Sequence, residues 1–458
     1  MEQPKTVNAH QTVERHTFPP GLHNAFWFSM FNALSYQIVL FSPMVLYAKT
    51  LGASATILGI IAGMMPMLVI FQIPAANYIP RLGFKQFVFA GWGTRVMFIF
   101  AMALVPLTGV FLSAGNRLAL LLTLLFCFNL SRGISSCAWL PWITELVPAS
   151  LRGKYLSLDQ AVQNAGSFVT TLIGAGCLAG ATHPWQFALL FAFSAVMGAV
   201  SLSFLKRIPD VEIPEEIRAS RTKVPWREMI NYRPFKKLLF TVIAFSVAYG
   251  GIQAFTVAFL KVEADMSETK ILLTTSSAFI GGLSSLWFLG SRLDRLGSKP
   301  VLSFCFAMWV AVLAGWFSLA SHLVTMKIVL VLMLQFSMGL LAALVSMSNT
   351  RLAMVVVPRM GRNHFFAIYS VANNVTLGLA PVAWGLLIDA VGARSATWLG
   401  VQWNRFAIFF AAAAVAFLVT LVLTRRLEEP EAASMEELLR EILVESPQRF
   451  WLRFWPRG

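Results

Sequence analysis

The sequence predicts an all-α membrane protein with twelve transmembrane helices, and three observations lead to this fold class. Hydrophobic residues make up 57% of the 458-residue chain and charged residues only 12%, which is about half the charged share of soluble domains. Long stretches contain no Asp, Glu, Lys or Arg, and about 20 apolar residues suffice to cross the hydrocarbon core of a bilayer as a helix. These runs lack the short alternating pattern of barrel strands, so we expect helices.

Twelve crossings follow from these stretches. Residues 160–205 supply two spans, divided by the turn-forming ATHPW at 181–185. Residues 118–144 supply one more, which is interrupted only by Arg132. The other nine are the charge-free runs 16–48, 50–80, 96–116, 238–260, 271–291, 301–326, 328–350, 363–388 and 406–424.

The distribution of Lys and Arg sets the expected orientation, because positively charged loops are retained on the cytoplasmic side. With the N-terminus inside, 28 of the 36 Lys and Arg residues fall in cytoplasmic segments or helix ends, Arg95 among them, and seven fall outside. We therefore expect a multi-pass protein of a bacterial inner membrane with both termini in the cytoplasm. The net charge of +15 is then a topology signal, and it does not indicate nucleic-acid binding.

The longest internal polar stretch divides the spans six and six. Shifted by 210 residues, PASLRGKYLSLDQAVQNAG falls on PRMGRNHFFAIYSVANNVT, and the pattern Arg-Leu-Gly-x-Lys occurs at 81–85 and again at 295–299. Such a repeat builds two bundles around a central cavity. The expected parts are a cytoplasmic N-terminal tail at 1–21, a first bundle at 22–205, a cytoplasmic linker at 206–237, a second bundle at 238–425 and an amphipathic cytoplasmic tail at 426–458.

The loop GSRLDRLGSKP at 290–300 resembles the signature of the major facilitator superfamily, G-x-x-x-D-R-x-G-x-K. The first copy departs from the signature, because Pro80 replaces the aspartate and only Arg81, Gly83 and Lys85 remain. The segment ELVPASLRGK at 145–154 is similar to the loop between the fourth and fifth helices of that superfamily. The matching positions in the second copy are Gly290, Asp294, Arg295, Gly297 and Lys299.

The resemblance implies a transporter that works by alternating access, with these loops as gates. In the superfamily the aspartate at Asp294 faces a helix N-terminus in the other half, here near Leu151, and a carboxylate there is stabilised by about 0.3–2 kcal/mol. We expect this contact to hold the cytoplasmic side closed, and a fixed loop brace is the alternative. The remaining gating candidates are Glu145, Arg152 and Arg362.

Arg132 stands inside the apolar run FCFNLSRGISSCAWLPW at 126–142. An Arg near the bilayer centre costs from about 3 to more than 10 kcal/mol, and no Asp or Glu occurs between Glu14 and Glu145. Its guanidinium suits a carboxylate or phosphate because its donors match two oxygens at once. A gating or proton-relay role and pairing with amides remain open. Drug/proton antiporters of the superfamily carry an Arg here within R-x-x-x-G, but Ser136 occupies the Gly position.

Polar side chains at helical spacing predict the cavity walls, although they could equally form hydrogen bonds between helices. Asp159, about six residues into the fifth span, is the candidate carrier of a coupling proton. The alternative for Asp159 is a solvated group or a partner of Arg152 or Lys154. Besides Arg132, the candidate substrate-binding residues are Asn32, Tyr36, Tyr249, Gln253, Gln163, Asn164, Asn373 and Asn374.

We therefore predict a secondary active transporter of a small organic anion, with protons as the candidate coupling ion. The alternatives are a proton-driven exporter of drugs or other amphipathic compounds, and an assembly or scaffold factor of similar fold that does not transport. The absence of acids from the first four spans disfavours cation export. The sequence contains no nucleophile–base set, metal cluster or phosphate loop, so we expect no enzyme, no cofactor and no metal site. The expected partners are a small-molecule substrate and membrane lipid, and we expect a monomer.

Overall fold

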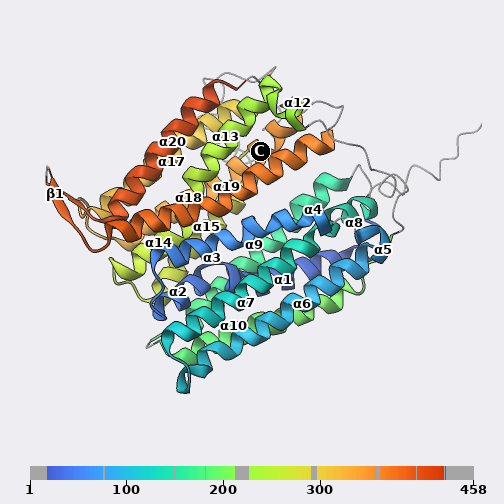
Figure 1. Ribbon diagram of the computed structural model, residues 1–458, viewed down its shortest axis with the longest axis horizontal. Coiled ribbons are helices and arrows are strands. Elements are labelled where there is room, and N and C mark those ends of the chain that lie inside the picture. The colour runs from blue at the N-terminus through green and yellow to red at the C-terminus, as the bar shows by residue number, and fades with distance from the viewer. Residues whose placement is uncertain are drawn as a thin grey trace, which may run out of the picture.

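A computed structural model describes residues 18–75, 78–147, 151–180, 182–211, 226–289, 297–356, 362–398, 400–427 and 429. Within these residues the chain forms two helical bundles that lie side by side (Figure 1). The first bundle contains α1 (His23–Leu40), α2 (Ser42–Thr50), α3 (Ala55–Met67), α4 (Gln72–Ala75), α5 (Ile79–Leu82), α6 (Phe84–Leu104), α7 (Ala114–Ser135), α8 (Trp139–Leu146), α9 (Arg152–Cys177) and α10 (Pro184–Leu205), with 3₁₀ turns at Leu68–Phe71, Val105–Val110 and Ser136–Ala138.

The second bundle follows the same plan. A short antiparallel hairpin of β1 (Ala396–Trp398) and β2 (Val401–Trp403) interrupts it before the last helix and projects beyond the bundle (Figure 1). The helices of the second bundle are α12 (Trp226–Asn231), α13 (Arg233–Tyr249), α14 (Ile252–Val262), α15 (Glu268–Leu289), α17 (Ser298–Ala320), α18 (Ile328–Val356), α19 (Arg362–Val391) and α20 (Arg405–Arg425).

The predicted number of spans agrees with this architecture. In the described part of the chain, ten helical segments are long and apolar enough to cross a membrane. The helices α9 and α15, which pack on each other where the two bundles meet, bring the long segments to twelve. The prediction of an all-α membrane fold with two six-helix bundles is thus confirmed, and the hairpin is a small local departure from it.

The third span begins earlier than the charge-free run suggested. α6 starts at Phe84, directly after Gly83, whose φ of +82° places it in the left-handed region. α17 likewise starts directly after Gly297, with φ +81°, so the two loops of the repeat use glycine in the same way. With this start, Arg95 lies in the middle of α6 and is only 2% exposed. The prediction that Arg95 lies at a helix end is therefore wrong.

The first span of each half is broken near its middle. α1 ends at Leu40 and α2 begins at Ser42, with Phe41 in an extended conformation and Pro43 in the first turn of α2. In the second half the break falls between α13 and α14 at Gly250 and Gly251, where Gly251 has φ +83°. A Cβ at Gly250 would lie 2.6 Å from Ala380. Glycine therefore permits both the left-handed turn and the close approach of α19.

The two halves pack tightly along α3 and α19. A Cβ at Gly63 would lie 2.1 Å from the carbonyl oxygen of Gly378, and a Cβ at Gly59 would lie 2.2 Å from that of Pro381. Small residues let two helix backbones approach closely, which is how helices associate inside a membrane. The end of the molecule where α3 begins and α19 ends is called the Asp389 end below.

Candidate functional site

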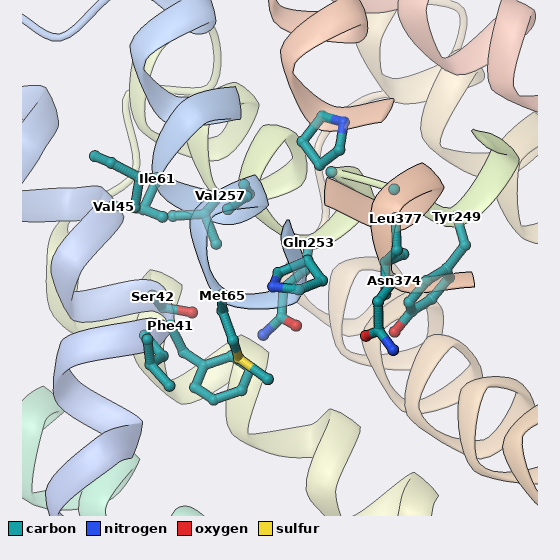
Figure 2. Close-up of a pocket in the computed structure, with 17 residues that line it drawn as sticks. Phe41, Ser42, Val45, Ile61, Met65, Tyr249, Gln253, Val257, Asn374 and Leu377 are labelled. Carbon is teal, nitrogen blue, oxygen red and sulfur yellow. The ribbon is translucent and has the colours of Figure 1, made fainter. Parts of the chain in front are cut away.

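A cavity of about 300 Å³ lies between the two halves, around the breaks in their first spans. Figure 2 shows Gln253 between Phe41, Ser42 and Met65 on one side and Asn374 and Tyr249 on the other. Three of the predicted substrate-binding residues therefore line one cavity. The remaining lining residues are mostly apolar: Leu40, Val45, Ile61, Ala62, Pro66, Gly250, Gly251, Ala254, Val257, Leu377 and Pro381.

Two of the polar side chains in this cavity have no hydrogen-bond partner among the described residues. The Gln253 amide and the Tyr249 hydroxyl are partly exposed and make no hydrogen bond with any described residue. The Tyr249 ring is fixed by stacking on Phe245 at 5.3 Å and by an edge contact with Trp309 at 5.7 Å between ring centroids. A rigid phenol and a free amide, on either side of the break between α13 and α14, can thus donate to or accept from a bound molecule.

Three of the four predicted asparagines, on α9 and α19, differ from one another in their contacts. Asn374 lines the cavity, and its amide nitrogen donates to the carbonyl of Ser370 at 2.9 Å. Asn373 instead accepts a hydrogen bond of 2.9 Å from the Ser246 hydroxyl and joins α13 to α19. Asn164 accepts from Gln160 on the same helix at 3.3 Å. The adjacent residues Asn373 and Asn374 therefore have different roles, since one joins two helices and the other lines the cavity.

A second polar cluster fills the space between α1 and α9 in the first half. The Ser29 hydroxyl donates to one oxygen of Asp159 at 2.5 Å, and the Gln163 amide donates to the other at 2.7 Å. The Tyr36 hydroxyl donates in turn to the Gln163 carbonyl oxygen at 3.3 Å. Asp159 is 9% exposed. Two hydrogen bonds, through Gln163, therefore connect a buried carboxylate to Tyr36.

Arg132, on α7, is close to this cluster. Its charge acts on the phenol of Tyr36 and on the guanidinium of Arg95. The Arg132 guanidinium makes no hydrogen bond or ion pair with any residue that the structure describes, and the residue remains partly exposed. Asp159 is near Tyr36, but its two oxygens are already held by Ser29 and Gln163.

Arg95 is a second guanidinium in this region, and the sequence reasoning missed it. It lies 4.6 Å above the ring of Trp92 and 5.7 Å from the ring of Phe128, and one of its terminal nitrogens donates to the side-chain oxygen of Asn32. Cation–π contacts are worth about 2 kcal/mol or more when desolvated. Asn32, predicted to bind substrate, therefore binds Arg95. Counting about 20 residues from the Gly83 turn would have revealed that Arg95 is inside the span.

The cluster in the first half is linked to the cavity through one aromatic contact. The ring of Tyr36 packs against Phe41 with 6.2 Å between centroids, and Phe41 lines the cavity. The phenol of Tyr36 thus bonds to Gln163, while its ring contacts Phe41, which lines the cavity. Arg132 itself does not line the cavity, and Phe41 and Tyr36 lie between the two.

At the Asp389 end of the molecule, two polar contacts join the halves. Asp389 accepts hydrogen bonds from the backbone N–H groups of Ala55 at 2.9 Å and Thr56 at 2.7 Å, where α3 begins. Glu268, at the start of α15, accepts from Thr182 at 3.0 Å and pairs with Lys261 at 2.7 Å. Neither acid was among the gating residues predicted from the sequence.

The predicted gating residues lie toward the other end, and the structure describes only some of them. Gly83 and Gly297 begin α6 and α17 as described above, and the backbone N–H of Lys299 donates to Glu429 at 2.7 Å. Arg81 and Glu145 are exposed and Lys85 is partly exposed. Outside the described residues are Gly290, Asp294 and Arg295, and also the side chains of Arg152 and Arg362.

Glu429 is a contact that the sequence did not suggest. Its carboxylate also accepts the backbone N–H of Ser298 at 2.9 Å and pairs with Arg351 at 2.5 Å. It therefore occupies the N-terminus of α17, where an acid is favourable, and fastens the segment after α20 to the second bundle.

Two bundles of six spans that enclose a cavity between broken helices define a membrane transporter. Residues 25–286 and 254–456 match the family profile of the Major Facilitator Superfamily, and the chain belongs to this superfamily. Among curated protein sequences, none matches the chain significantly.

Several solved transporters have the same fold. A D-xylose–proton symporter is 14% identical, with a TM-score of 0.69 over 90% of this chain and 99% of its own. The xylose transporter XylE from E. coli, in an inward-open conformation, is also 14% identical, with a TM-score of 0.67 over 91% of this chain and 98% of its own. A mutant of the nucleoside transporter NupG is 12% identical, with a TM-score of 0.67 over 89% of this chain and 100% of its own. Identities this low show the fold alone.

Proposed function

We propose that this protein is a secondary active transporter of a small organic anion, in which Arg132 binds the anionic group. The observation that carries the proposal is the guanidinium of Arg132, which lies within a transmembrane helix and has no hydrogen bond or ion pair from any described residue. A charge in this position costs from about 3 to more than 10 kcal/mol unless a partner or water compensates it. A carboxylate or phosphate on the substrate would supply that partner.

The central cavity would hold the rest of the substrate, which would reach Arg132 past the side chains of Phe41 and Tyr36. Its walls are mostly apolar, and Gln253 and Tyr249 offer uncommitted polar groups. The helices α2 and α14 begin at or beside cavity-lining residues, and the positive end of a helix dipole favours nearby negative charge. Broken helices whose ends point at an anionic group are a recurring device in transporters. These features favour an anion with an apolar body.

Alternating access would proceed by opening the Asp389 end while the other end closes. With both termini in the cytoplasm, as the distribution of Lys and Arg favours, the Asp389 end faces outward. The conformation described above would then be closed to the outside. In the opposite state, the contacts of Asp389 with Ala55 and Thr56 would break and the loop containing Asp294 would meet the start of α9.

Protons are the coupling ion that the first-half cluster favours. Asp159 is the buried acid of this cluster, and Gln163 links it to Tyr36. Protonating Asp159 would weaken the hydrogen bonds that it accepts from Ser29 and Gln163. The rearranged amide would change the hydrogen bond available to Tyr36, and through Tyr36 the surroundings of Arg132.

A ligand screen by thermal shift on purified protein tests the proposal. The probes are a monocarboxylate, a dicarboxylate, a phosphate ester and a cationic dye, each applied to the parent, Arg132→Gln and Arg405→Gln. Arg405 is the control because it pairs with Glu263 at the Asp389 end, at 2.9 Å, away from the cavity. We expect at least one anion to stabilise the parent and Arg405→Gln but not Arg132→Gln.

Two results would overturn the proposal in favour of a different function. Stabilisation of all three proteins by the cationic dye alone would favour an exporter of amphipathic cations. The absence of any ligand effect, together with no uptake of the same probes into proteoliposomes, would favour an assembly or scaffold role.

A further inference from the structure

A groove of about 410 Å³ runs between α6 and α7 on the outer surface of the first bundle, separate from the central cavity. Phe87 and Phe98 line it on α6, and Leu130 and Ile134 line it on α7. Its floor is the crossing of the two helices, since a Cβ at Gly91 would lie 2.1 Å from the Cβ of Ser135. From Phe87 to Phe98 the groove extends ~16 Å along the helix axis, at 1.5 Å per residue.

The hydroxyl groups that line the groove are already paired. Thr94 donates to the carbonyl of Ala90 at 2.9 Å, Ser131 donates to that of Gly91 at 3.0 Å, and Ser135 donates to that of Ser131 at 2.8 Å. None of these hydroxyl hydrogens is left to bind a polar ligand. The groove therefore suits an apolar occupant.

The surroundings of the groove identify the medium from which that occupant comes. Both helices are transmembrane segments, and Met97 and Phe126 beside the groove are 71% and 44% exposed. In a bilayer such side chains face lipid tails. An acyl chain can therefore enter the groove without leaving the hydrocarbon core. A chain that lies in a fixed groove keeps its contacts with both helices.

One end of the groove is positively charged. Leu82 lines this end, and its neighbours Arg81 and Lys85 are exposed and partly exposed, respectively. Neither makes an ion pair with any described acid. Because this end lies at the terminus of a span, the two cations are placed at the depth of lipid headgroups, where basic residues attract anionic lipids.

We infer that this groove is a binding site for an anionic phospholipid. One acyl chain lies between α6 and α7, and the phosphate headgroup lies against Arg81 and Lys85. The site would tie a lipid to the loop between α5 and α6, which the first copy of the repeat keeps despite the loss of its aspartate at Pro80. The inference stands independently of the transported substrate, since no residue of the groove lines the central cavity.

Native mass spectrometry of the full-length protein in detergent tests the inference. The purified protein is mixed with equal amounts of phosphatidylglycerol and phosphatidylcholine, and the lipid-bound masses are compared at rising collision energy. Ala90→Phe fills the groove, and Ala119→Phe is the matched control, because Ala119 is an exposed alanine of α7 that does not line it. Arg81→Gln with Lys85→Gln removes the headgroup charges, and Arg394→Gln is the control at the Asp389 end.

We expect the parent, Ala119→Phe and Arg394→Gln to retain phosphatidylglycerol in preference to phosphatidylcholine. Ala90→Phe should lose most of the bound lipid, and the Arg81/Lys85 double variant should lose the preference while it still binds lipid. Equal retention of phosphatidylglycerol by Ala90→Phe and the parent would show that the groove is not the lipid site. Equal retention of the two lipids by the parent would overturn the anionic headgroup, and a homodimer that Ala90→Phe disrupts would show that a second copy covers the groove instead.

Discussion

The carboxylate of Asp389, in the last turns of α19, accepts a hydrogen bond of 2.7 Å from the backbone N–H of Thr56 at the start of α3. The neighbouring N–H of Ala55 binds the other oxygen at 2.9 Å. An acid at an exposed helix N-terminus is worth about 0.3–1 kcal/mol. Since the two helices belong to different halves, this energy is present only while the Asp389 end is closed.

Asp389→Asn should therefore shift the protein toward the state in which this end is open. The loss of about 0.3–1 kcal/mol raises the open-to-closed ratio about 2- to 5-fold. Electron paramagnetic resonance between nitroxides at Thr50→Cys and Arg394→Cys, in a variant without the four native cysteines, measures this ratio. Glu263→Gln is the control, because its pair with Arg405 lies within the second half. An unchanged distance distribution in Asp389→Asn would contradict the role of Asp389 in closure.

Gly63→Ala should have a larger effect on the same equilibrium. Its new methyl group would lie 2.1 Å from the carbonyl oxygen of Gly378, and overpacking of this kind costs about 1–3 kcal/mol. The same distance measurement should show the closed-to-open ratio fall about 5-fold or more. Gly93→Ala should leave it unchanged, because a Cβ at Gly93 meets nothing within 4 Å. Equal effects of the two substitutions would point to helix propensity instead of inter-half packing.

Gln253→Leu and Asn373→Leu should separate binding from stability. The Gln253 amide makes no hydrogen bond with a described residue, so its loss should leave Tm near that of the parent and weaken ligand binding about 2- to 13-fold, the value of one hydrogen bond. Asn373→Leu deprives Ser246 of its acceptor, which costs about 1–3 kcal/mol, so Tm should fall. Calorimetric unfolding and titration with the anion from the screen measure both quantities. A fall in Tm for Gln253→Leu would show that this amide stabilises the folded protein, which would contradict the prediction.

Much of the fold could be predicted from the sequence because the bilayer imposes a simple rule. Any run of about 20 residues without charges must form a helix there, so twelve spans and their division into halves follow from counting. The break at Gly250 and Gly251 and the early start of α6 at Phe84 depend on local backbone geometry and on neighbours from α19. Arg95 was misplaced for this reason, since it directly precedes the charge-free run at 96–116 and so resembles a helix end.

The candidate site was predictable only in part. Helical spacing brought out Tyr249, Gln253 and Asn374, because polar residues in a span avoid lipid and turn inward. The same rule cannot distinguish a free amide from one that bonds another helix, and Asn32 and Asn373 are of the second kind. Asp389 and Glu429 were missed because their partners are backbone N–H groups of distant residues, which leave no pattern in the sequence.

Asp159→Asn should uncouple transport from the proton gradient without abolishing exchange. Asparagine retains an oxygen that can accept from Ser29, as Asp159 does at 2.5 Å, but it cannot take up or release a proton. Proteoliposomes loaded with the anion should show counterflow close to that of the parent. Accumulation of the anion in response to an imposed pH difference should be lost. Glu263→Gln, which removes an acid that pairs with Arg405 within the second half, should keep both activities. If Asp159→Asn still accumulates the anion against its gradient, the coupling proton is carried by another group.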